Sequence, residues 1–235
     1  MDNSWKVPIM WEGGEVWILG GGPSLPRQFG VPEDVIKKVY SGDLTPGAYS
    51  EYMKAIHDKH VIGINMAFKI GNWIDMVFFG DNKFYLQSRQ DMAKFPGLKV
   101  TCHTNFKNTN HNEKIKYLQK DKSRPKGITE HRGKVSWNAN SGAAAISVAA
   151  NAGAKRIILV GFDMTLDEGK NQHWHKLYQV KGSKTRDEKK RPFNRHLSGF
   201  EQIAKDAKKR GIEIINASPS SKITQFKKVP VKELI

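Results

Sequence analysis

Residues 15–25 read Glu-Val-Trp-Ile-Leu-Gly-Gly-Gly-Pro-Ser-Leu, an apolar run of strand length that passes directly into three glycines. The run predicts a buried first strand, and the glycines predict a sharp turn immediately after it. Similar apolar runs recur along the chain and alternate with segments of helical spacing. This alternation predicts an α/β fold, with a Rossmann-like, doubly wound and mostly parallel sheet.

The segments that follow this stretch support the same fold. Strands are expected at residues 60–65, 73–79, 98–102, 156–160 and 212–215, and helices at residues 32–40, 50–59, 82–94, 141–152 and 197–210. Two polar, basic excursions interrupt the pattern, at about residues 103–136 and 166–195. The first of them is typical of an irregular or partly mobile loop. We expect one domain over residues 1–235 that contains both excursions.

The composition is that of a globular protein with an excess of positive charge. The formal net charge is +16, which attracts polyanions over long range. No apolar run approaches the roughly 20 residues of a membrane helix, and the start of the chain lacks the pattern of a secretory signal. A single cysteine, Cys102, excludes an internal disulfide. These features predict a cytoplasmic protein without a membrane span, and they leave its oligomeric state open.

The turn Gly20-Gly21-Gly22-Pro23-Ser24 is the first candidate binding site. Backbone N–H groups in such a turn can cradle a phosphate, and the Ser24 hydroxyl would add a donor. The pattern lacks the third spaced glycine of the dinucleotide fingerprint and the Gly-Lys-Ser/Thr of a P-loop, so a purely structural turn also explains it. On the phosphate hypothesis, valine at position 22 would block the ligand and leave the fold intact.

Further candidates follow other predicted strands. Ligands of open parallel sheets bind beyond the carboxyl ends of the strands. The loops that leave those ends begin at Gly20, Asn65, Gly80-Asp81 and Gly161. Asp81 and Asp163 offer oxygen ligands for Mg²⁺ on a diphosphate, or each caps a turn. The sequence therefore predicts that these groups meet at one edge of the sheet.

Three segments carry a resemblance to known families. They are Val-Trp-Ile-Leu-Gly-Gly-Gly-Pro-Ser-Leu at 16–25, Ile64-Asn65, and the stretch from Asn140-Ser141-Gly142 to Gly161-Phe162-Asp163. In order and spacing they resemble the bacterial lipooligosaccharide sialyltransferases. They also resemble the MptE-like group, whose archaeal members are hydroxymethylpterin diphosphokinases. The similar segments cover about half of the chain.

The resemblance to the sialyltransferases implies roles for individual residues. A cytidine nucleotide would be held by Gly21, Gly22, Ser24 and Asn65, and the helix start at Ser141 and Gly142 would face it. We include the adjacent Gly20, Pro23 and Asn140, and the strand-end residue Asp81, in the candidate donor-binding set. His196, just before the last long helix, would be the general base, and its ordinary pKa near 6.5 suits that role. Asp163 would be a catalytic or structural residue. The family's phosphate-binding tyrosine and its arginine are replaced by Thr165 and Asn138.

The excursions contain two further features. His173-Trp174-His175 places two imidazoles on one side of an extended segment, which suits either a zinc ion or a lid that stacks Trp174 on a base or sugar. Basic residues are concentrated at Lys107–Lys134 and Lys181–Arg195. Such runs suit a nucleic-acid backbone or another polyanion, and they also suit a solvated loop.

Three functions remain open on the sequence. The first is a transferase of the glycosyltransferase type, which carries a group from a nucleotide or nucleotide-sugar donor to a hydroxyl acceptor. Nucleic acid would be one such acceptor, as in DNA-modifying enzymes of viral type. The second is an MptE-like diphosphokinase that uses ATP and Mg²⁺ on a small hydroxymethyl substrate. The third is a nucleic-acid-binding module without catalysis. The nucleobase, the donor group and the metal dependence are not set by the sequence.

Overall fold

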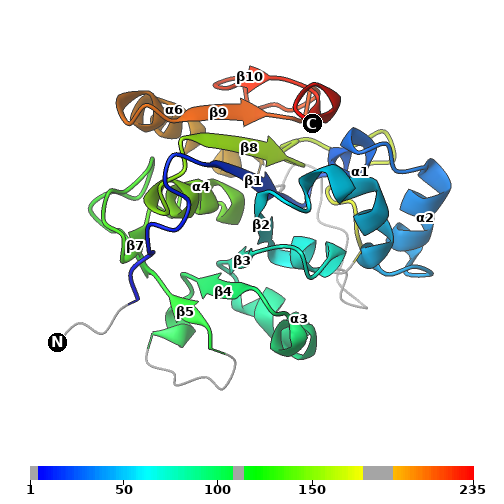
Figure 1. Cartoon of the computed structure of the whole chain (residues 1–235), viewed down its shortest axis with the longest axis horizontal. Helices are drawn as coiled ribbons and strands as arrows, with labels where there is room; N and C mark the ends of the chain where they lie inside the picture. The colour runs from blue at the N-terminus through cyan, green and yellow to red at the C-terminus, as the bar shows by residue number, and fades with distance from the viewer. Residues whose placement is uncertain (1–4, 108–113, 177–192) are drawn as a thin grey trace.

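A parallel sheet forms the centre of the computed structural model, which describes residues 5–107, 114–176 and 193–235. Eight strands within these ranges lie in the order β10-β9-β8-β1-β2-β3-β4-β5, and every adjacent pair is parallel (Figure 1). The strands are β1 (Glu15–Leu19), β2 (His60–Ile64), β3 (Met76–Phe79), β4 (Leu98–Thr101), β5 (Lys116–Tyr117), β8 (Arg156–Val160), β9 (Glu213–Asn216) and β10 (Lys227–Lys228). The predicted α/β, doubly wound fold is confirmed.

Strand β1 lies at the point where the strand order changes direction. The chain proceeds from β1 through β2, β3 and β4 on one side, and β8, β9 and β10 follow on the other side. Strands β1 and β8 are neighbours in the sheet, so the loops that follow them start side by side and then diverge. Ligands of doubly wound sheets bind at such a switch point.

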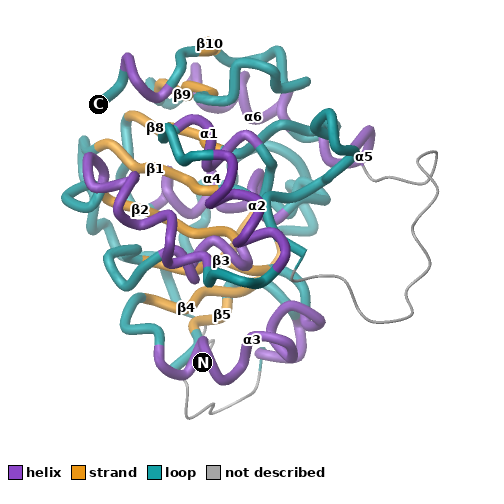
Figure 2. The backbone as a smooth tube through the Cα atoms, turned by 90° about the vertical axis from the view of Figure 1, so that its right-hand side faces the viewer, coloured by secondary structure: helices purple, strands orange, loops and turns teal. Residues whose placement is uncertain are grey.

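Both faces of the sheet are covered, which explains why the central strands are apolar throughout. Val16 and Ile18 face one core, which also contains residues of α4 (Ser141–Asn151) and α6 (Phe200–Lys209). Trp17 and Leu19 face the other core. That second core includes residues of α1 (Ser24–Gln28), α2 (Glu33–Ser41), the 3₁₀ helix η1 (Pro46–Ile56) and α3 (Asn82–Lys94). Figure 2 shows α1, α2 and α3 in front of the strands.

Two predicted helices differ from the observed ones. The α-helix expected at 50–59 is the 3₁₀ helix η1, which begins four residues earlier at Pro46, where a proline is preorganised for the first turn. The helix expected at 197–210 begins three residues later, as α6. The short helix α5 (Phe193–Leu197) precedes it and lies mostly in the segment expected as the second excursion. Gly199, directly before α6, packs closely on Asn138, because a Cβ there would lie 2.6 Å from the Asn138 Oδ1.

The described part of the first excursion is held by buried polar groups. It contains the short parallel pair β6 (Gln119–Lys120) and β7 (Lys134–Val135), and 3₁₀ helix η3 (Thr104–Phe106). The Asp206 carboxylate accepts hydrogen bonds from the Ile128 N–H and from Gln202, and it also pairs with Arg124. Asn138 bonds both backbone groups of Gly127. Apart from these short elements, the described residues 114–136 are irregular, as expected, while 108–113 lie outside the described residues.

Two short 3₁₀ helices complete the described elements, η2 (Asn65–Ile70) directly after β2 and η5 (Val231–Glu233) near the end of the chain. Among the helices of the described ranges, we find none with the length and apolar character that crossing a membrane requires.

Candidate functional site

The glycine turn after β1 is packed against the end of β8. The Gly20 N–H donates to the Val160 carbonyl at 2.7 Å, and the Gly22 N–H donates to the Gly161 carbonyl at 2.8 Å. A Cβ on either Gly20 or Gly22 would lie 2.6 Å from the Gly161 oxygen. Glycine is therefore required here because two chain segments approach closely. We therefore expect valine at position 22 to strain this packing and destabilise the protein, in contrast to the expectation from the sequence alone.

Trp174 binds the other side of the same turn. Its backbone N–H donates to the Gly21 carbonyl and its indole Nε1–H donates to the Gly20 carbonyl, both at 3.1 Å. The side chain is only 2% exposed, and Tyr49 packs edge-on against the ring. The hypothesis of a lid that stacks Trp174 on a ligand is therefore wrong, because this indole holds the turn.

The neighbouring histidines do lie on one side of the segment, as expected. The rings of His173 and His175 are stacked with centroids 5.3 Å apart. The described residues contain no group of three or more His, Cys, Asp or Glu side chains that would hold a metal ion. The zinc hypothesis gains no support from them.

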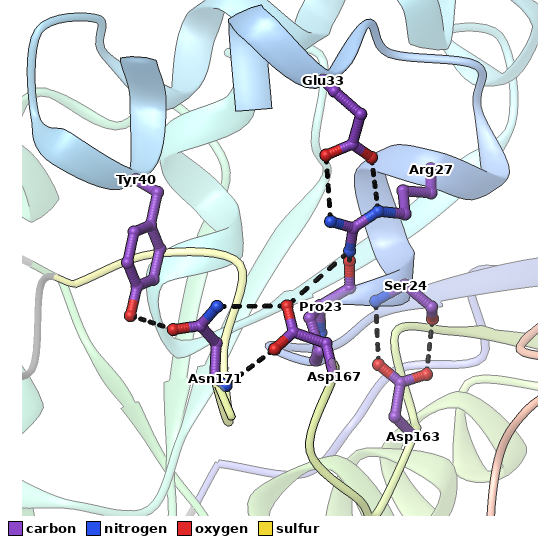
Figure 3. A network of polar contacts seen from close by, with 8 residues as sticks. All are labelled: Pro23, Ser24, Arg27, Glu33, Tyr40, Asp163, Asp167 and Asn171. Carbon is purple, nitrogen blue, oxygen red and sulfur yellow. Dashed lines mark hydrogen bonds and ion pairs between the residues drawn. The ribbon is translucent and has the colours of Figure 1, made fainter. Parts of the chain in front are cut away.

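Ser24 and Asp163 connect the turn to the loop after β8 over 139 residues of sequence. The Ser24 backbone N–H and its hydroxyl donate to the two different oxygens of the Asp163 carboxylate (Figure 3). Asp163 is 3% exposed, and burial raises the pKa of its carboxyl group while the bonds from Ser24 oppose that shift. The Ser24 hydroxyl therefore donates its hydrogen bond to Asp163, and the sequence had suggested a phosphate as its acceptor.

We expect Ser24→Ala to lower the free energy of unfolding by about 1–3 kcal/mol, because one oxygen of a buried carboxylate loses its donor. The loss should be smallest in acid, where the Asp163 carboxyl is protonated, and should grow as the pH rises through its raised pKa. Denaturant titration at several pH values measures this. Ser220→Ala, an exposed serine on the same cavity, should change stability by less than about 0.5 kcal/mol. Equal losses for both variants would contradict the assignment.

The start of α4 lies beside the glycine turn. The Phe162 ring separates them, since a Cβ would lie 3.1 Å from this ring at Gly20 and 2.7 Å from it at Gly142. The structure thus brings two predicted donor-binding segments together. Asn140 caps the helix, because its Oδ1 accepts from the N–H groups of Gly142 and Ala143. These two amides are therefore already satisfied within the protein.

Gly80 at the end of β3 also reaches this edge. The rim of the Trp137 indole occupies the space of a Cβ at Gly80, and the Ser141 Oγ would lie 3.3 Å from such a Cβ. Asp81, the next residue, caps α3 by accepting from the Lys83 N–H at 2.8 Å. The cap that the sequence left open for Asp81 is therefore observed, and its carboxylate is exposed.

Asn65, at the end of β2, combines two unusual features. Its φ is +51°, a left-handed conformation that asparagine tolerates better than most residues. Its side-chain Oδ1 is buried and has no hydrogen-bond partner among the described residues. Buried acceptors of this kind are rare in folded proteins, and strained backbone is concentrated at functional sites.

His196 lies on α5, half-buried. Burial, and secondarily the neighbouring Arg195, lower the pKa of its imidazole. His196 in turn contributes to lowering the pKa of His173, which burial brings to about 4. His173 also forms a hydrogen bond with the Gly21 backbone, so His196 lies near the histidine that contacts the turn.

A cavity of about 810 Å³ opens next to the turn, a volume typical of small-molecule sites. Its lining includes Pro23, Ser24, Asp163, His173 and Trp174 beside the turn. Residues of α2 and of the loop at 165–176, together with Arg27 and Ser220, complete the lining. Its charged lining residues are the carboxylates Glu33, Asp163, Asp167 and Glu168 and the cations Arg27, Lys37 and Lys176. The cavity is therefore close to neutral in a chain whose net charge is +16.

A hydrogen-bond network fixes the walls of this cavity (Figure 3). Arg27 donates to both oxygens of Glu33, at 2.6 and 3.1 Å, and Asp167 accepts from the backbone and side chain of Asn171. The Tyr40 hydroxyl donates to the Asn171 Oδ1. Sequence reasoning missed all of these residues. The bond between Tyr40 and Asn171 spans 131 residues, and no local pattern signals it.

Comparisons with known proteins support this architecture at the level of fold. No protein-family model and no curated protein matches the sequence. Among solved structures, the MAf glycosyltransferase from Magnetospirillum magneticum AMB-1 has a TM-score of 0.57 at 13% identity, over 100% of this chain and 37% of that one. The sialyltransferase CstII from Campylobacter jejuni, in complex with CMP-3FNeuAc, has a TM-score of 0.50 at 16% identity, over 92% of this chain and 86% of that one. The fold of this chain is thus similar to that of these two glycosyltransferases, and the resemblance to the MptE-like group stays a prediction.

Proposed function

We propose that this chain is a nucleotide-dependent transferase of the glycosyltransferase type, which binds a nucleotide-activated donor at the carboxyl edge of its sheet. Two of the similar structures, MAf and CstII, are a glycosyltransferase and a sialyltransferase by name, and CstII is in complex with the substrate analogue CMP-3FNeuAc. This supports the proposal. The glycine turn follows β1 at the switch point beside β8, and ligands of doubly wound sheets bind at such a point, which supports the proposal further.

The observation that carries the proposal is the buried, unpartnered Oδ1 of Asn65. An amide oxygen accepts hydrogen bonds and so requires a donor group. Phosphate oxygens at neutral pH supply none, whereas a ribose hydroxyl or a base amino group does. We therefore assign Asn65 to the nucleoside part of the donor. The glycine turn, which packs against the end of β8, would form one side of this donor site.

His196 supplies the base in this proposal. Its lowered pKa keeps the imidazole neutral and able to take a proton from an acceptor hydroxyl. The acceptor oxygen then bonds to the transferred carbon of the donor. The bond from that carbon to the phosphate oxygen breaks, and the nucleotide leaves with the electron pair. The proton remains on His196 until it passes to solvent.

The acceptor would occupy the cavity beside the turn, whose lining includes His173, and His196 lies near that histidine. The near-neutral lining favours an uncharged, hydroxyl-bearing acceptor over a polyanion such as nucleic acid. Most of the basic run Lys181–Arg195, which suggested a polyanion, lies outside the described residues.

Asn65→Gly tests the proposed nucleoside contact. Glycine accepts the positive φ and removes only the side chain, so the fold should persist. Loss of one neutral hydrogen bond should weaken the binding of a recognised nucleoside by roughly 3- to 10-fold. Calorimetric titration with cytidine and uridine measures this change.

Asn72→Gly is the matched control, because Asn72 is exposed in the loop before β3 and should leave affinity unchanged. If Asn65→Gly binds the nucleoside as tightly as the wild type, the Oδ1 of Asn65 does not contact the donor and the proposal loses its main support.

A further inference from the structure

The donor phosphate requires a positive charge that the backbone of the proposed site does not supply. In the turn, the N–H groups of Gly20, Gly22 and Ser24 donate within the protein, and Pro23 has none. At the start of α4, Asn140 occupies two of the amides. The phosphate cradle that the sequence suggested is thus largely filled by internal bonds, which leaves a side chain to provide the charge.

Lys120 is a cation whose position near this edge is fixed by an aromatic contact. Its Nζ lies 4.2 Å from the centroid of the Trp137 ring. The rim of that ring contacts Gly80, beside Ser141, so Trp137 connects Lys120 to the predicted donor-binding residues. The pairing of β6 with β7 sets this arrangement, because Lys120 lies opposite Val135, two residues before Trp137.

The ammonium of Lys120 lacks an acidic partner in the described ranges. Lys120 is only partly exposed, and none of the ion pairs found there involves it. The Trp137 ring attracts the ammonium without neutralising its charge. A partly buried cation held in this way is suited to an anionic ligand.

We infer that Lys120 binds the phosphate of the donor nucleotide, positioned over Trp137 at the carboxyl end of β3. This inference rests on the proposed function, since it assigns a residue to the same donor site. Sequence reasoning treated Lys120 as one of many lysines in a basic excursion. The contact with Trp137 distinguishes it from them.

The test is titration of wild type, Lys120→Met and Lys122→Met with CMP and with cytidine. Methionine keeps the apolar stem and removes the charge, and Lys122 is an exposed neighbour that serves as the matched control. Lys120→Met should weaken CMP binding at least tenfold and leave cytidine binding unchanged. Lys122→Met should bind both ligands as the wild type does, and Lys120→Arg should recover most of the CMP affinity.

Two results would overturn the inference while leaving the proposed function in place. One is unchanged CMP affinity in Lys120→Met. The other is an equal loss for CMP and cytidine, which would indicate a structural role for the side chain. If the wild type binds neither ligand nor any other nucleotide, the proposed function itself fails, and the inference fails with it.

Discussion

His196→Ala should lower turnover by roughly 10²- to 10⁴-fold and leave donor affinity almost unchanged. A positioned general base contributes a factor of this size, and it acts on the acceptor hydroxyl. His196 lies on α5 near His173, whose ring contacts the glycine turn. Single-turnover rates, together with donor titration of the same preparation, separate the two quantities.

The pH dependence gives a second readout on the same residue. Burial and Arg195 lower the pKa of His196 below its ordinary value near 6.5. Because the neutral imidazole is the active form, turnover should fall only as the pH drops below that ordinary value. In His196→Ala this acidic limb should disappear.

Asn194→Ala is the matched control, since Asn194 is exposed on the same short helix. It should retain full turnover. The base assignment would be wrong if His196→Ala kept full turnover. If a chelator also stopped the wild-type reaction, the Mg²⁺-dependent diphosphokinase would become the better hypothesis.

Gly22→Val should lower the free energy of unfolding by about 3 kcal/mol or more. A Cβ at this position would lie 2.6 Å from the Gly161 carbonyl oxygen and would also press on the Asp163 carboxylate, so the two strand ends would have to separate. For a chain of this length, such a loss corresponds to a fall in Tm of roughly 6–12 °C. Thermal denaturation followed by circular dichroism measures it.

Gly47→Val is the comparison, because Gly47 is exposed and a Cβ there meets only the Thr45 Oγ1, at 3.4 Å. It should change Tm by no more than about 2 °C. A Gly22→Val protein with wild-type Tm and lost nucleotide binding would reverse the assignment, since it would show that the position is open to ligand.

The fold was largely predictable because its signals are local. The apolar run before Gly20 and the five-residue run Arg156–Val160 mark β1 and β8 to the residue. The polar residue before Ser141 is the observed cap of α4. Local signals did not predict that η1 is a 3₁₀ helix. Over a short segment, apolar spacing does not distinguish a 3₁₀ helix from an α-helix.

The placement of the candidate groups at strand ends was predictable, and the bonds that these groups form were less so. Strand ends placed Gly20, Asn65, Gly80 and Gly161 at one edge, as the parallel sheet requires. The partners of these groups come from distant segments. Ser24 bonds Asp163 across 139 residues, and Trp174 binds a turn 154 residues away. Such pairs depend on tertiary packing, which no spacing rule in one sequence encodes.

The most direct test of nucleotide-donor binding is thermal stabilisation of the full chain by CMP, CDP, UDP, GDP and ATP, each with Mg²⁺ and with chelator. A ligand that binds only the folded state should add about 2.7 kcal/mol at 100 times its Kd. We expect CMP or UDP to raise the Tm equally with Mg²⁺ and with chelator. Stabilisation by ATP alone, and only with Mg²⁺, would contradict the glycosyltransferase proposal, and no stabilisation by any of the five would contradict nucleotide binding itself.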